Sequence, residues 1–193
     1  FSMADYRNYP AWKNLSGQDL AVAVWQAFVG TETGVAHFQP IREGPDPVDW
    51  EFRHIRDPIK MLNVYGYGFC GAFGPTTAGL FEAMGFEQAR SAYIPGCNHN
   101  VTEVWYDGAW HYFDTDLRGV LFQRDGKSIA SLAEARDQLD LWLNPSKKIS
   151  PFFPDASPNL ERLARTYGAK PISYNYHWFM SGATMDFRLR TGE

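Results

Sequence analysis

Residues 98–116 read NHNVTEVWYDGAWHYFDTD and contain the clearest structural signal in the chain. Two strand-like runs, 99–106 and 109–116, flank the dipeptide Asp107-Gly108. This dipeptide is typical of the two-residue type I′ turn, because both of its residues tolerate positive φ angles. The stretch therefore predicts a β-hairpin.

The two-residue turn also fixes which residues face one another across the hairpin. If Tyr106 pairs with Ala109, counting outward places His99 opposite Asp116. Side chains alternate between the faces of a strand, so His99 and Asp114 share one face as diagonal neighbours. Diagonal pairs have backbones roughly 7–8 Å apart, a gap that an imidazole and a carboxylate can close by leaning together. The hairpin thus predicts a histidine–carboxylate pair.

Cys70 lies where a second predicted element, a helix, begins. Apolar residues recur at helical spacing from Cys70 to Met84, and Gly85 is placed to end the helix. The dipole and the free N–H groups of a helix N-terminus favour a thiolate, and the same N–H groups could hold an oxyanion. We therefore expect Cys70 to be a nucleophile, with His99 as its base and Asp114 as the group that orients the base.

The runs 66–90, GYGFCGAFGPTTAGLFEAMGFEQAR, and 98–116 together resemble the core of the transglutaminase-like superfamily. In that family a cysteine at a helix start is followed by a histidine and then by an aspartate. The helix leads to a glycine and an arginine-containing strand, which Gly85 and Arg90 match, and the strand of the third member ends as Asp114-Thr115 does here. The resemblance covers about residues 55–120.

What the resemblance implies is a thiol enzyme. Carried over residue by residue, Cys70 is the nucleophile, His99 the base and Asp114 the third member. The implied fold is α+β with a papain-like core, in which N-terminal helices pack on an antiparallel β-sheet. No cofactor or metal is needed for this chemistry. The family includes protein cross-linkers, peptidases and amidases, so the expected partner is a protein, a peptide or another amide.

The sequence departs from the family pattern in three places. Pro75 lies inside the predicted helix and could kink it or delay its start. Asp116 replaces a small or polar residue and adds a second carboxylate near His99. The side chain that the family supplies to the oxyanion is not assigned, with Trp50 and Tyr65 as candidates.

The rest of the chain predicts five further elements and a loop. Helix-start signals at Ser16-Asp19, Asp57-Pro58, Ser131-Glu134 and Ser157-Pro158 predict helices, and 183–190 alternates like a half-buried strand. The helix that starts near Ser16 is expected to end at Gly30, the one at Asp57 at about Val64, the one at Ser131 at about Leu143 and the one at Ser157 at Gly168. Residues 31–50 are expected to form a loop, and 183–190 a strand.

Length and composition limit the function classes. The 193 residues suit one domain, 1–193, which we expect to have been cut from a longer protein. With 45% hydrophobic residues the chain can bury a core. Its net charge is -4 and it has no Lys/Arg cluster, so we expect no nucleic-acid partner. No apolar run reaches the roughly 20 residues that span a bilayer, so the chain is expected to be soluble. Two cysteines do not fix the compartment, and the oligomeric state stays open.

Several residues have simpler explanations than catalysis. Glu103 could be a structural partner of Arg90 or a participant in the reaction, and it is left outside the site. Cys97 is expected to pack in the core, with a disulfide to Cys70 as a minority alternative. The scattered histidines show no zinc-ligand spacing, and the run YNYHWF over 174–179 suits a core or a groove wall.

The sequence therefore predicts cysteine-dependent acyl transfer on an amide or ester through a thioester, with water as the expected acceptor. The alternative is a non-catalytic binding or scaffold module that keeps the same fold, with a carbohydrate-related role as one form of it. Reactivity of Cys70 toward iodoacetamide distinguishes the two, because an activated thiolate reacts where a buried cysteine does not.

Overall fold

The computed structural model of the chain describes residues 3–29, 36–37, 61, 67–68, 70–94, 99–116, 118–138, 140–143 and 173–175. Within them lie five α-helices, one 3-10 helix and six strands. The helices are α1 (Met3–Arg7), η1 (Pro10–Trp12), α2 (Gly17–Val29), α5 (Cys70–Ala83), α6 (Leu132–Asp137) and α7 (Asp140–Leu143). The strands are β1 (Ala36–His37), β2 (Tyr67–Gly68), β3 (Gln88–Ile94), β4 (His99–Tyr106), β5 (Ala109–Phe113) and β6 (Ser173–Asn175). The described residues therefore form an α+β fold.

A four-stranded antiparallel sheet in the order β5-β4-β3-β6 organises the structure, while β1 and β2 form a separate parallel pair. The predicted hairpin is confirmed: β4 and β5 pair from Tyr106 with Ala109 outward. Asp107 and Gly108 have φ angles of 50° and 78°, as a type I′ turn requires. Strand β6 adds to the far side of β3, where Ala92 pairs with Tyr174.

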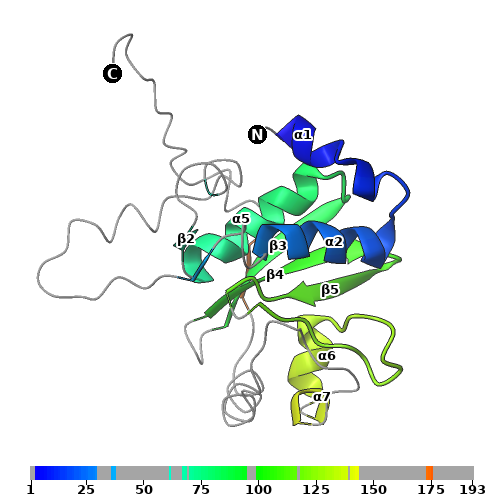
Figure 1. The fold of residues 1–193 in the computed structure, drawn as a ribbon. Coiled ribbons are helices and arrows are strands. Elements are labelled where there is room, and N and C mark those ends of the chain that lie inside the picture. The colour runs from blue at the N-terminus through cyan, green and yellow to red at the C-terminus, as the bar shows by residue number, and fades with distance from the viewer. Residues whose placement is uncertain are drawn as a thin grey trace, which may run out of the picture.

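Helices cover both faces of this sheet (Figure 1), and residues on both faces of β4 are buried. Helices α2 and α5 pack on one face, where Val104 and Phe113 join their core. Helices α6 and α7 lie over the other face, where Val101 and Tyr112 pack with Leu132. The central strands are thus buried from both sides.

Helix α5 begins at Cys70, as predicted, and ends at Ala83, one residue before the predicted Met84. Its end is a Schellman motif: Phe86 N–H donates to Phe81 O at 3.2 Å, and Gly85 N–H donates to Glu82 O at 3.0 Å. Gly85 has φ 97°, and the Phe81 and Phe86 rings pack edge to face with centroids 5.5 Å apart. The Gly85 stop predicted from sequence is therefore built as expected.

Pro75 does not delay the start of α5, in contrast to the doubt raised by the sequence. The helix runs through Pro75, which is buried in its second turn. The helix approaches the sheet closely at the preceding residue, because a Cβ on Gly74 would lie 2.9 Å from Ser91 Oγ on β3. Thr102 Oγ1 donates to Gly74 O at 2.8 Å, which joins β4 to the helix at this point.

The capping box predicted at Ser131 and Glu134 is present, with both reciprocal hydrogen bonds. The predicted helix to Leu143 is wrong in extent, because α6 ends at Asp137 and the short α7 follows from Asp140. Glu134 O accepts from Gln138 N–H in the last turn of α6, where Gln138 leaves helical geometry with ψ 76°.

Other predictions fall partly or wholly outside the described residues. The helix predicted to Gly30 is confirmed as α2, and the predicted loop over 31–50 contains the short strand β1. Several predictions lie outside the described residues: the helices over 57–64 and 157–168, the strand over 183–190, and the roles of Trp50, Tyr65 and Cys97. Within these ranges the structure describes only Met61, which is buried. The described part of the chain contains no helix with the length and hydropathy needed to cross a membrane.

Candidate functional site

His99 and Asp114 form the centre of the candidate site. His99 is the first residue of β4, and Asp114 follows the last residue of β5, so the hairpin register makes them diagonal neighbours. His99 Nε2 lies 2.8 Å from Asp114 Oδ2, and both residues are buried, with 7% and 1% of their surface exposed. The histidine–carboxylate pair predicted from the turn is thus observed, and it holds the imidazole through Nε2.

Cys70 approaches this pair from the start of α5. Its Sγ, a ring nitrogen of His99 and a carboxylate oxygen of Asp116 all lie within 4.8 Å of one another. Because Asp114 occupies Nε2, the other ring nitrogen, Nδ1, is left for Cys70 and Asp116. Cys70 is half-buried, and its position at the first residue of a 14-residue helix places it beside the positive end of the helix dipole.

The surroundings of His99 favour its protonated form. Burial alone would lower the pKa of His99, but the charge and hydrogen bond of Asp114 and, after them, the hydrogen bond and charge of Cys70 outweigh it. The pKa of His99 is therefore raised well above its ordinary value. A protonated imidazole has a proton to give to a leaving group and a positive charge that stabilises a neighbouring anion.

Asp116 is a second carboxylate beside the same imidazole. Its Oδ2 lies 3.9 Å from His99 Nδ1, and its side chain is 7% exposed. The sequence placed it opposite His99 by register, although the strand pairing ends before it and Asp116 lies in the turn that follows β5. It therefore faces the ring nitrogen that Asp114 leaves open.

Tyr112 is a site residue that the sequence reasoning missed. Its hydroxyl donates to Asp114 Oδ2 at 3.0 Å, the same oxygen that holds His99. The signal was available, because residues two apart on one strand share a face and Tyr112 precedes Asp114 by two. Tyr112 thus limits the positions that the Asp114 carboxylate can take.

Thr115 anchors the aspartate-bearing turn to the helices on the opposite face of the sheet. Its Oγ1 lies 2.7 Å from Thr77 Oγ1 on α5, and it also accepts from Trp25 Nε1 at 3.3 Å. The turn itself is closed by paired backbone hydrogen bonds between Asp114 and Gly119, at 2.8 and 2.9 Å. These contacts connect the residue after Asp114 to the helix that begins with Cys70.

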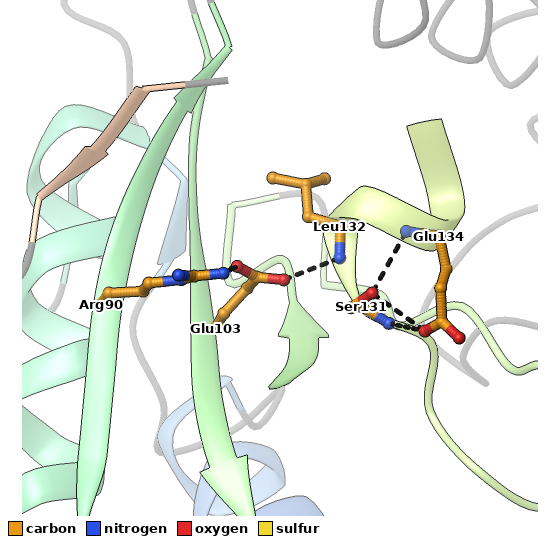
Figure 2. A network of polar contacts seen from close by, with 5 residues as sticks. All are labelled: Arg90, Glu103, Ser131, Leu132 and Glu134. Atoms are coloured by element: carbon orange, nitrogen blue, oxygen red, sulfur yellow. Dashed lines mark hydrogen bonds and ion pairs between the residues drawn. The ribbon is translucent and has the colours of Figure 1, made fainter. Parts of the chain in front are cut away.

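Glu103 is a structural residue rather than a member of the site. As Figure 2 shows, its Oε2 accepts from Arg90 Nε at 2.8 Å and its Oε1 accepts from Leu132 N–H at 2.7 Å. Glu103 is fully buried, and the Arg90 guanidinium lies between the rings of Trp110 and Tyr174, 3.8 and 3.7 Å from their centroids. Of the two roles open from sequence, the ion pair with Arg90 is the one observed.

His111 takes no part in this arrangement. It lies on the other face of the hairpin, where Ile129 O is 2.6 Å from Nδ1 and the ring stacks on Tyr106.

Comparison of the chain with protein-family models, with curated proteins and with solved structures found no match.

Proposed function

We propose that the chain is a thiol acyltransferase or hydrolase of the transglutaminase-like kind, with the papain-like core which that family implies. The observation that carries the proposal is the bond between His99 Nε2 and Asp114 Oδ2 beside a cysteine at a helix start. It fixes one imidazole nitrogen by a carboxylate and leaves the other for the thiol, which is the arrangement of a nucleophile, a base and an orienter.

The reaction begins when the Cys70 thiolate attacks the carbonyl carbon of an amide or ester. The oxyanion that forms is stabilised by N–H groups of the first turn of α5, which have no acceptor within a helix. The His99 imidazolium gives its Nδ1 proton to the leaving amine or alcohol as the C–N or C–O bond breaks. A thioester on Cys70 and a neutral His99 remain.

The second half of the reaction reverses these roles. Neutral His99 accepts a proton from water or from an amine as that molecule attacks the thioester, and the thiolate leaves. Water gives hydrolysis and an amine gives cross-linking or transamidation. We propose hydrolysis of a protein, peptide or related amide, because His99 can accept a proton from either nucleophile and water is the one that is always present.

The test is trapping of the acyl-enzyme. The full chain, treated with a chelator, is mixed with an activated ester such as p-nitrophenyl acetate and quenched in acid for intact-mass and peptide mapping. We expect one acetyl group on Cys70, a burst of nitrophenolate, and loss of both in Cys70→Ala and in His99→Asn. Acetylation at unselected lysines, or equal acetylation in Cys70→Ala, would exclude the proposed nucleophile.

A second measurement separates this proposal from a binding module. Iodoacetamide at mildly acidic pH should alkylate Cys70 in the parent faster than in His99→Asn, because the imidazolium is what stabilises the thiolate. Equal rates in the two proteins would favour a module without turnover.

A further inference from the structure

Three donor atoms of different chemistry converge at the start of α5. A thiol from Cys70, an imidazole nitrogen from His99 and a carboxylate oxygen from Asp116 lie within 4.8 Å of one another, with 3.9 Å between His99 Nδ1 and Asp116 Oδ2. Sulfur, nitrogen and oxygen ligands lie at about 2.0–2.3 Å from zinc, which places neighbouring ligands of a tetrahedral site roughly 3.3–3.8 Å apart. Small side-chain movements would therefore bring the three atoms to ligand distance.

The type of ligands selects the metal. Calcium and magnesium prefer sites made of oxygen atoms, whereas a thiolate and an imidazole beside one carboxylate suit zinc and similar borderline cations. Asp114 and Asp116 also place two carboxylates beside the imidazole of His99, so a divalent cation reduces the negative charge gathered there.

The surroundings of His99 are those of a metal-ligating histidine. Metal-bound histidines usually donate their other ring N–H to a carboxylate, which fixes the ring and the tautomer. His99 Nε2 already bonds to Asp114 Oδ2 at 2.8 Å, and Tyr112 holds that same oxygen. The imidazole is therefore oriented with Nδ1 toward Cys70 and Asp116 before any metal arrives.

We propose that Cys70, His99 and Asp116 bind one zinc-class divalent cation, which withdraws the thiol from acyl transfer. From the thiolate–imidazolium pair, binding releases the His99 Nδ1 proton to solvent and forms one S–metal, one N–metal and one O–metal bond. Water takes the fourth position, and no electron is transferred. The regulatory part of this inference rests on the proposed function, whereas the metal site itself does not.

The test measures the metal without a substrate. Chelator-treated full chain is titrated with Zn²⁺ by calorimetry and with Co²⁺ by absorption spectroscopy, in the parent, in Cys70→Ser, in Asp116→Asn and in Asp137→Asn. The last variant is the matched control, because Asp137 is an exposed aspartate whose partner is the adjacent Arg136. Far-ultraviolet circular dichroism of each variant shows that it is folded.

We expect one zinc equivalent in the parent and in Asp137→Asn, with affinity at least about tenfold weaker in Asp116→Asn. The cobalt complex should show a thiolate-to-metal charge-transfer band in the parent that is absent in Cys70→Ser. Zinc should also protect Cys70 from iodoacetamide until chelator is added. A cobalt band that persists in Cys70→Ser, or unchanged affinity in Asp116→Asn, overturns the site.

The two proposals fail separately. An acyl-enzyme on Cys70 in a protein that binds no zinc would overturn the metal site and leave the acyl-transfer proposal standing. Zinc binding at these residues in a protein that never forms the acyl-enzyme would overturn acyl transfer alone.

Discussion

Thr77 and Thr115 join the helix that begins with Cys70 to the turn that presents Asp114, through hydroxyl oxygens 2.7 Å apart. Both residues are fully or nearly fully buried, and they lie 38 positions apart in the sequence. The contact sets the distance between the thiol-bearing helix and the aspartate-bearing turn.

We predict that Thr77→Val and Thr115→Val each lower the free energy of unfolding by about 1–3 kcal/mol, because each leaves a buried hydroxyl without its partner. The double variant should lose less than the sum of the two, since both ends of the bond are then apolar. Thr115→Val should cost more than Thr77→Val, because it also leaves Trp25 Nε1 unpaired. Urea unfolding of the four proteins measures the coupling, and additive losses would show that the two hydroxyls do not interact.

For the proposed chemistry, Cys70→Ala and Asp114→Asn should behave differently. Cys70→Ala removes the nucleophile and should abolish turnover. Asp114→Asn keeps the size of the side chain but can hold the wrong tautomer of His99, so it should lower kcat by about 10²–10⁴-fold. Steady-state kinetics with an activated ester tests this, with Asp137→Asn as the control. Full activity in Cys70→Ala would place the site elsewhere.

Glu103→Gln should be among the most destabilising substitutions in the described core. It keeps an acceptor for Leu132 N–H but leaves the guanidinium of the buried Arg90 facing an uncharged amide. Removing one partner of a buried ion pair costs about 3–5 kcal/mol. The matched control is Glu134→Gln, which changes the half-buried carboxylate of the capping box and should cost about 0.5–2 kcal/mol. Equal losses in urea unfolding would contradict the buried-pair explanation.

The hairpin and the His99–Asp114 pair could be predicted from sequence because both follow from local turn chemistry. Asp107-Gly108 sets the turn, the turn sets the register, and the register brings the two side chains together. The approach of Cys70 was different. Nothing local places a helix start beside a strand start, so that expectation depended on the resemblance to a family.

Elements held only by distant contacts were not predictable. Strand β6 pairs with β3 across about eighty residues, and β1 and β2 have two residues each, too few for a periodic pattern. The Thr77–Thr115 contact joins two residues 38 positions apart. No residue pattern around either threonine predicts that the two hydroxyls meet. Glu103 was ambiguous for the same reason, since the cap it provides at Leu132 comes from 29 residues away.

Gly74→Ala should destabilise the protein even though alanine is normally the better helix former by about 1 kcal/mol. A Cβ at Gly74 would lie 2.9 Å from Ser91 Oγ and 3.1 Å from both Asn100 Cβ and Val101 O, and overpacking of this kind costs about 1–3 kcal/mol. Ser91→Ala in the same chain should restore part of the loss, because it removes the nearest atom. Ser91 Oγ is buried without a hydrogen-bond partner among the described residues, so Ser91→Ala alone should cost little. Thermal unfolding of the three variants tests this, and an increase in Tm for Gly74→Ala would contradict the close approach.

Tyr6 and Tyr106 should respond differently when their hydroxyls are removed. The Tyr6 hydroxyl donates to Val24 O at 2.7 Å, whereas the Tyr106 hydroxyl is buried without a hydrogen-bond partner among the described residues. Tyr6→Phe should therefore lower the free energy of unfolding by about 1 kcal/mol near neutral pH, and Tyr106→Phe should leave it unchanged or raise it. The exposed Tyr9 gives the control, Tyr9→Phe, which should leave the free energy of unfolding near that of the parent. Urea unfolding at neutral pH measures all three, and a loss of about 1 kcal/mol in Tyr106→Phe would contradict the unpaired hydroxyl.

The same two tyrosines should make the protein less stable in alkali. Burial raises the pKa of Tyr6, and burial together with the charge of Asp107 raises the pKa of Tyr106, so both phenols stay protonated in the folded chain above the ordinary value of 10.0. Because the folded pKa is the higher one, this stabilisation is fully present below pH 10 and is lost as the pH rises toward the folded pKa, since the unfolded chain then releases protons that the folded chain retains. Each tyrosine should contribute a fall of about 1.4 kcal/mol per pH unit in that range. Urea unfolding between about pH 9 and pH 12 should give a shallower fall for Tyr6→Phe and for Tyr106→Phe than for Tyr9→Phe. Parallel curves for all three variants would show that neither buried phenol keeps its proton in the folded protein.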